Sequence, residues 1–292
     1  MHSRRALFLA ATLLLVCFHS VRAQVSVVDD LQRAVSLRAP ATRIVSLAPS
    51  ITESLFAIGA GDRVVGVTDY CDYPADARRR PRVGGMINPN IEAVVGLKPD
   101  LIVLSMEGNI RDDFRRLTGL GFPVLVTNPR TFEGIYRSLG QLGTLTGCAD
   151  SAARLVAQLR ARESALRQSG SRESVRALLV VSVQPLLVAG RNTFIHEVLE
   201  AAGAVNLAAY ARGNYPAYSR ETVVANNPDV ILVTSDAMSD ASALYRLFPE
   251  WQIVSAVRHR RVFRVESNLI TRPGPRALDA LESLVHLLHT AR

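Results

Sequence analysis

Two glutamates lie near the start of a sequence segment that occurs twice in this chain and is called the repeated phrase below. Glu92 lies in NIEAVVGLKPDLIVLS (90–105) and Glu221 in SRETVVANNPDVILVTS (219–235), and the valines and the Pro-Asp pair that follow keep the same offset. A polar residue two positions before each glutamate can cap a short helix, which places the carboxylate near the positive end of the helix dipole. One such acid only stabilises its helix, whereas a matched pair favours docking to a partner that itself has two-fold repetition.

A second group of residues has the chemistry to hold an organic ligand. Tyr70 and Tyr73 in DYCDYP and Tyr215 and Tyr218 in NYPAY offer flat apolar faces with a polar edge. The alternative is that these rings pack against their own loops. Arg272 offers forked donors to amide or carboxylate groups of a ligand, or else forms a salt bridge between turns.

Catalytic and metal-binding patterns are missing from the sequence. It contains no GxSxG, Walker A, HExxH or complete GxGxxG motif, and acids such as Asp72 in an exposed loop are usually solvated. The histidines after residue 23 lie on an expected terminal helix or within packed segments (His196, His259, His286, His289). We therefore expect no enzyme, no metal site and no cofactor, and we keep a secreted α/β enzyme as the alternative from another class.

Short apolar strands alternate with helical segments in both halves of the chain. We expect strands at 43–48, 63–68, 101–105, 123–127, 177–182, 230–235 and 261–266, and helices at 52–58, 110–120, 192–204 and 276–289, with Asn192 as an N-cap. Near-continuous apolar strands of this kind suit parallel sheets that are covered on both faces. Ligands of such folds bind at the carboxyl ends of the strands, here at segments such as 68–74, 105–109, 235–238 and 268–272.

Residues 148–170 have an apolar stripe opposite an arginine-rich face, which predicts one helix of about 18 residues. No Gly/Ser-rich or Pro-rich linker separates the halves. The sequence therefore predicts an N-terminal α/β lobe (24–146), a stiff connecting helix (147–170) and a C-terminal α/β lobe (171–292), with little hinge motion.

The N-terminus has the pattern of a secretory signal peptide. A basic start precedes a short apolar run, and Ala23 offers a cleavage point; a lipid anchor at Cys17 is less favoured because Val16 before it is large. Removing residues 1–23 lowers the formal charge from +8 to +5, and the arginine runs lack interleaved aromatics, so we expect no nucleic-acid partner. Cys71 and Cys148 remain as a possible disulfide in an oxidising compartment.

Five stretches together resemble a known family. They are RIVSLAPSITESLFAIGAGDRVVGVTDYCDYP (43–74), NIEAVVGLKPDLIV (90–103), SRETVVANNPDVILV (219–233), WQIVSAVRHRRVFRV (251–265) and RPGPR (272–276). The chain is similar to the class III substrate-binding proteins of ABC importers, the cobalamin and iron-siderophore type, and most similar to the cobalamin-binding BtuF-type members. The resemblance implies a periplasmic protein, monomeric when free, with two Rossmann-like lobes bridged by a long helix.

The same resemblance implies roles for particular residues. Glu92 and Glu221 match the positions that dock, one per lobe, onto arginines of the dimeric membrane permease. The residues at or near ligand-contacting positions are Tyr70, Met86, Tyr215, Asn268 and Arg272. Cobalamin-binding members surround the corrin ring with tryptophans, whereas this sequence has only Trp251, in a stretch that reads as packing. The expected ligand is thus a corrinoid, with a ferric siderophore or haem as the alternative.

Overall fold

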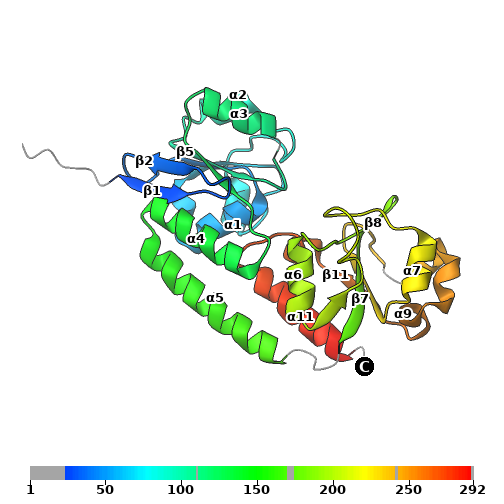
Figure 1. Cartoon of the computed structure of the whole chain (residues 1–292). Helices are drawn as coiled ribbons and strands as arrows, with labels where there is room; N and C mark the ends of the chain where they lie inside the picture. The colour runs from blue at the N-terminus through cyan, green and yellow to red at the C-terminus, as the bar shows by residue number, and fades with distance from the viewer. Residues whose placement is uncertain (1–23, 110, 170–173, 241–242, 291–292) are drawn as a thin grey trace, which may run out of the picture.

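The computed structural model describes residues 24–109, 111–169, 174–240 and 243–290, which form two lobes joined along one side by helices (Figure 1). The elements of the N-terminal lobe are β1 (Val25–Val28), β2 (Ala34–Leu37), β3 (Ile44–Ser46), α1 (Pro49–Ala57), β4 (Val64–Val67), α2 (Ile91–Gly96), β5 (Leu101–Ser105), α3 (Arg111–Gly119), β6 (Val124–Thr127) and α4 (Phe132–Thr146). The long helix α5 (Ala149–Ser169) follows. Short 3-10 turns occupy Gly61–Arg63 and Ala75–Arg79.

The C-terminal lobe contains β7 (Val175–Val183), β8 (Leu186–Val188), α6 (Phe194–Ala201), β9 (Ala204–Asn206), α7 (Arg220–Asn226), β10 (Val230–Thr234), α8 (Leu244–Leu247), a 3-10 turn (Pro249–Ile253), α9 (Ser255–Arg258), β11 (Val262–Val265), α10 (Ser267–Ile270) and α11 (Ala277–Thr290). The expected α/β class, with two mostly parallel sheets and one long helix between them, is confirmed. The exact domain boundaries stay a prediction.

The N-terminal sheet has the strand order β4-β3-β5-β6, and every pairing is parallel. Successive residues of β5 alternate between two clusters of buried side chains: Leu101 and Val103 face α1 and α4, whereas Ile102 and Leu104 face α2 and α3. Helices therefore cover both faces, which explains why the strand reads as a continuous apolar run.

The C-terminal sheet has the order β11-β10-β7-β8, with β9 also paired to β7; β8 runs antiparallel and the other strands run parallel. On β10, Leu232 faces α6 and α11, whereas Ile231 and Val233 face α7, α8 and α9. Trp251 is fully buried on this second face, 4.3 Å from Phe248 between ring centroids, so it packs inside the lobe as expected.

Most element boundaries differ from expectation by a few residues, and some elements were not expected. The first helix begins at Pro49, because proline suits the first helical turn. The N-cap of α6 is Thr193 and not Asn192, since the Thr193 hydroxyl accepts from the backbone N–H of His196. The sequence prediction did not include helix α4, the β1–β2 hairpin, β8, β9, α8 or α10.

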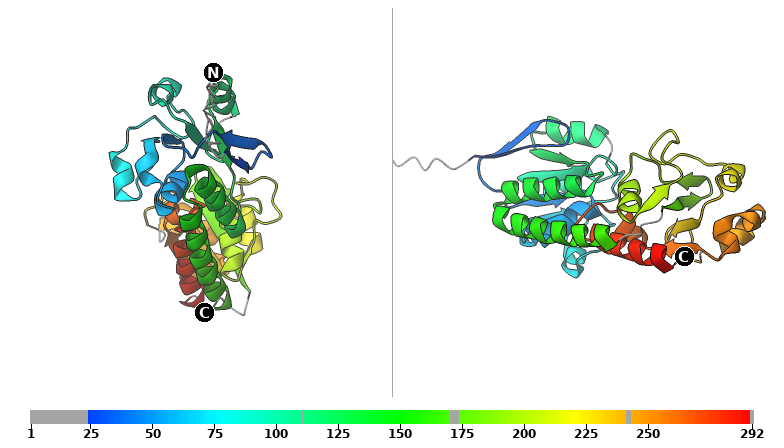
Figure 2. Two further views of the ribbon diagram at one scale, coloured as in Figure 1. Left: turned by 90° about the vertical axis from the view of Figure 1, so that its left-hand side faces the viewer. Right: turned by 60° about the horizontal axis from the view of Figure 1, so that its bottom comes forward.

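The two lobes share one hydrophobic core along the side where α4, α5, α6 and α11 meet (Figure 2). Phe132 of α4 and Phe194 of α6 are in edge-to-face contact, with 5.5 Å between ring centroids. Arg162 of α5 reaches Asp279 of α11 at 2.7 Å. No helix within the described ranges combines the length and apolar character that crossing a membrane requires.

Candidate functional site: a cavity between the lobes

A cavity of about 320 Å³ lies between the lobes at the carboxyl ends of their strands. Its lining includes all five residues that the sequence analysis placed at the ligand: Tyr70, Met86, Tyr215, Asn268 and Arg272. Tyr70 follows β4 and Met86 lies in the loop before α2, whereas Tyr215 precedes α7 and Asn268 lies in α10. The structure therefore brings the five side chains together from both lobes, and their contact with a ligand stays a prediction.

A larger hollow of about 910 Å³ lies beside the β1–β2 hairpin, lined by residues such as Leu37, Pro40 and Pro123. All of its lining comes from the N-terminal lobe. The inter-lobe cavity combines aromatic faces with several convergent polar groups from two lobes, which is the usual character of a small-molecule site. We therefore take the smaller cavity as the candidate site.

Two tyrosine rings remain available at the cavity. Tyr70 is 60% exposed and Tyr215 is 41% exposed, so part of each side chain is open to contact at the cavity. Burial of the Tyr215 phenol and the nearby charge of Glu107 raise the pKa of Tyr215 to about 12, so the phenol stays protonated at neutral pH. Tyr73 instead lies under Arg276, and the Tyr218 hydroxyl donates to the carbonyl of Leu207.

Backbone contacts fix the loop that carries Tyr215. The N–H of Gly190 donates to the carbonyl of Asn214 at 2.8 Å, and the N–H of Val188 donates to that of Pro216. A Cβ on Gly190 would lie 2.6 Å from the carbonyl oxygen of Gly213, so only glycine permits this approach. Tyr215 is therefore held by two strand-like hydrogen bonds on either side of it.

Met86 is positioned by a side-chain amide and a glycine. The Nδ2 of Asn109 donates to the carbonyl of Met86 at 2.6 Å and to that of Leu47 at 3.1 Å. The Met86 methyl lies against Gly108, where any Cβ would meet it at 2.0 Å. Met86 thus offers a polarisable apolar surface to the cavity from a fixed backbone position.

Two carboxylates in the lining were not singled out from the sequence. Glu107 follows β5 and Asp236 follows β10, one on each lobe. Burial raises the pKa of Glu107, and Arg130, whose Nε lies 3.6 Å from the carboxylate, opposes that rise only in part. The signal that could have found them is an acidic residue directly beyond the carboxyl end of a buried strand.

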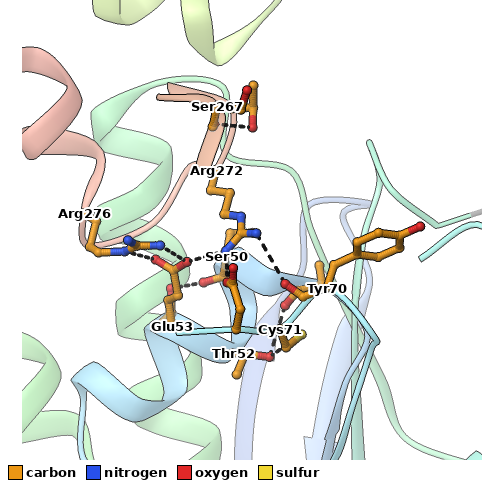
Figure 3. Close-up of polar contacts among 12 residues, drawn as sticks. Ser50, Thr52, Glu53, Tyr70, Cys71, Ser267, Arg272 and Arg276 are labelled. Carbon is orange, nitrogen blue, oxygen red and sulfur yellow. Dashed lines mark hydrogen bonds and ion pairs between the residues drawn. The ribbon is translucent and has the colours of Figure 1, made fainter. Parts of the chain in front are cut away.

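Arg272 makes salt bridges across the lobes (Figure 3). Its Nη1 lies 2.6 Å from Asp72 and 3.2 Å from Glu53, and its Nη2 donates to the carbonyl of Tyr70. Arg276 adds a two-pronged contact to Glu53 at 2.6 and 2.8 Å. The salt-bridge alternative for Arg272 is therefore present, and Asp72 is an ion-pair partner and not merely a solvated acid.

Glu92 and Glu221 are exposed and lie on different lobes, in α2 and α7, both away from α5 (Figure 1). Asn90 and Ser219 accept hydrogen bonds from backbone N–H groups two residues inside each helix and so cap it. The backbone N–H of Glu221 and the Ser219 hydroxyl lower the pKa of Glu221. The expected helix-start geometry exists in both copies, and docking stays a prediction.

Cys71 and Cys148 are both free thiols, so the possible disulfide is not formed. Cys71 is fully buried beside the hydroxyls of Thr52 and Thr68, each 3.1 Å from its sulfur. Within the described part of the chain, no group of histidine, cysteine and acidic side chains is arranged to hold a metal ion.

Comparisons with known proteins agree with this architecture. A family model described as periplasmic binding protein matches residues 44–269. The uncharacterised ABC transporter substrate-binding lipoprotein YvrC of Bacillus subtilis is 33% identical over 274 residues, which cover 91% of this chain and 85% of YvrC. The vitamin B12-binding protein of Vibrio cholerae is 32% identical over 255 residues, or 87% of this chain and 91% of that protein.

Two solved structures extend the likeness to three dimensions. The periplasmic vitamin B12-binding protein BtuF of Vibrio cholerae matches with a TM-score of 0.79 and 32% identity, covering 86% of this chain and 98% of BtuF. The periplasmic heme-binding protein RhuT of Roseiflexus sp. RS-1, in its apo form, matches with a TM-score of 0.78 and 28% identity, covering 85% of this chain and 98% of RhuT. One architecture is thus shared by proteins named for different tetrapyrroles.

Proposed function

Because this chain belongs to the periplasmic binding protein family and acts as the substrate-binding component of an ABC importer, we propose that its ligand is a corrinoid. The cavity between the lobes carries the proposal: Tyr70, Met86 and Tyr215 offer apolar faces from both sides, with an amide and carboxylates between them. A corrin ring is flat, apolar on its faces and fringed with amides, which suits such walls.

The proposed binding is tested by titrating the mature protein with cyanocobalamin, cobinamide, haemin and a ferric siderophore in a calorimeter. We expect stoichiometric binding of a corrinoid without chemical conversion. Binding only of a siderophore or of haemin would refute the corrinoid assignment, and turnover of any ligand would favour the enzyme alternative. Calorimetry is preferable to tryptophan fluorescence, because Trp251 is buried outside the cavity lining.

Haem is the second candidate, and one observation favours it. The phenol of Tyr70 lies at the cavity and is 60% exposed, and tyrosine is among the side chains that ligate haem iron. In that case haemin would bind with the absorption spectrum of a phenolate-ligated ferric haem, and Tyr70→Phe would abolish that spectrum. A Tyr70→Phe variant with an unchanged haemin spectrum would exclude ligation by this residue.

The proposed partner is a dimeric ABC permease, met by Glu92 on one lobe and Glu221 on the other. Rim charge pairs of this kind mainly set orientation and encounter rate.

The export step belongs to the same proposal: residues 1–23 act as a signal peptide cleaved near Ala23, with lipidation at Cys17 the less favoured route. Those residues lie outside the described part of the structure.

A further inference from the structure

The charges around the inter-lobe cavity are unevenly matched. Arg272 is the one cationic side chain in the described lining, and its guanidinium already faces Glu53, Asp72 and a backbone carbonyl. With Arg276 also bound to Glu53, this group contains two cations and two anions and sums to zero. The network therefore offers a ligand no free positive charge.

The remaining charged groups leave the cleft acidic. Glu107 is paired with Arg130, whose Nε lies 3.6 Å from the carboxylate and which is not itself part of the cavity lining. Asp236, on the opposite lobe, forms no ion pair among the described side chains. The backbone N–H of Asp236 donates to the hydroxyl oxygen of Ser267, which is almost fully buried in α10. This contact holds the loop that carries Asp236 against α10. A ligand between the lobes thus meets a carboxylate on each side.

We propose that Glu107 and Asp236 select ligands by charge, accepting hydrogen bonds from amide N–H groups and repelling carboxylate-bearing macrocycles. This inference rests on the proposed corrinoid function and goes beyond it, because it states which tetrapyrroles the cleft refuses. A carboxylate ligand would place like charges together where water is partly displaced, and such juxtapositions strongly disfavour a wrong partner. A primary amide in the same place donates to the carboxylate instead.

The test uses two probes that share one ring. Cobinamide carries amides around the corrin, and cobyrinic acid carries carboxylates at the corresponding positions. We expect the wild-type protein to bind cobinamide at least about 100-fold more tightly than cobyrinic acid, measured by calorimetry at neutral pH. The Glu107→Gln and Asp236→Asn variants are near-isosteric, and each is expected to shrink that ratio about tenfold.

Glu107→Gln has a second expected effect, because it leaves Arg130 without its counter-ion beside the cavity. Glu107→Gln should therefore bind cobyrinic acid more tightly than the wild-type protein does, whatever happens to its affinity for cobinamide. The matched control is Glu133→Gln on α4, which breaks an exposed ion pair with Arg160 of α5 and should leave the ratio unchanged. Thermal melts verify that each variant is folded.

The outcomes separate this inference from the proposed function. Equal binding of both corrinoids by the wild-type protein, or an unchanged ratio in both variants, overturns the charge selection and leaves the corrinoid assignment standing. Binding of dianionic haemin with no binding of either corrinoid overturns both. A large ratio that collapses only in the cavity variants supports both.

Discussion

Gly108 shapes the cavity by lacking a side chain. A Cβ there would lie 2.0 Å from the terminal carbon of Met86, so Gly108→Ala must push the methionine out of its place. Because methionine is flexible, we expect a stability change below about 1 kcal/mol. Corrinoid affinity should fall about tenfold, which corresponds to about 1.4 kcal/mol, as measured by calorimetry.

The control for this substitution is Gly119→Ala at the end of α3, where an added Cβ meets nothing within 4 Å. It should leave affinity unchanged. If Gly108→Ala binds corrinoid as tightly as the wild-type protein, Met86 does not contact the ligand.

Residues next to strand ends could be predicted from the sequence, and residues that act through distant partners could not. Tyr70 and Tyr215 line the cavity as strand-end reasoning expects. Glu53 was missed because its partners Arg272 and Arg276 lie 219 and 223 positions away, and no local pattern marks such a pair. Asp72 was misjudged for the same reason.

The repeated phrase does structural work in both lobes. Asp100 accepts from the backbone N–H of Arg43 before β3, and Asp229 accepts from that of Arg176 in β7. Each arginine side chain in turn donates to backbone carbonyls at the end of the short helix that precedes the Pro-Asp pair, which is α2 in the first copy and α7 in the second. The Pro-Asp part of the phrase is thus explained by folding alone, whereas the side chains of Glu92 and Glu221 are exposed to solvent.

Sequence periodicity found most elements but missed α4, and glycines explain why. Gly143 allows α5 to pack closely, since a Cβ there would lie 2.6 Å from the Cβ of Ala152. Gly134 and Gly140 occur in the same helix and lower its apparent helical tendency. A close helix–helix approach therefore needed residues that read as helix breakers.

The next prediction concerns α2 and α7, the helices that carry the two glutamates proposed to dock onto the permease. The double variant Glu92→Ala/Glu221→Ala should leave corrinoid affinity unchanged, because both side chains are exposed and outside the cavity lining. Transport by the cognate permease reconstituted in vesicles should fall at least about tenfold, because rim charges govern orientation and encounter.

A suitable control is Asp150→Ala, which removes an exposed acid from the first turn of α5, the same helix position on a different element. It should transport normally. A double glutamate variant that imports ligand at the wild-type rate would show that the repeated glutamates only stabilise their helices.

At the scale of the whole molecule, the lobes are held as one body. Phe132 and Phe194 join the two halves of a single core, and Arg167 of α5 reaches Glu197 of α6 at 2.9 Å. On the cavity side, Glu53 is almost fully buried between arginines from the other lobe. Removing one partner of such a buried cluster typically costs 3–5 kcal/mol. These contacts favour small closure on ligand binding, and the stiff connector expected from the sequence stays a prediction.

Asp72 makes the inter-lobe contact sensitive to acid. Burial raises the pKa of Asp72, but the hydrogen bond and charge of Arg272 outweigh it, so the pKa lies below its ordinary value of 3.8. A carboxyl whose pKa falls on folding stabilises the protein at a pH above its unfolded-state pKa, and this stabilisation is lost as the pH falls through its folded-state pKa.

We expect Asp72→Asn to lower the melting temperature at pH 7. The difference in melting temperature between the variant and the wild type should narrow below about pH 4. It should vanish once Asp72 of the wild type is fully protonated and is therefore as uncharged as the asparagine. Circular dichroism melts across this range measure it, with Asp76→Asn, whose partner Arg79 is exposed, as a control that should show little gap. A gap that persists unchanged to about pH 2 would mean that the Asp72–Arg272 ion pair does not hold the lobes together.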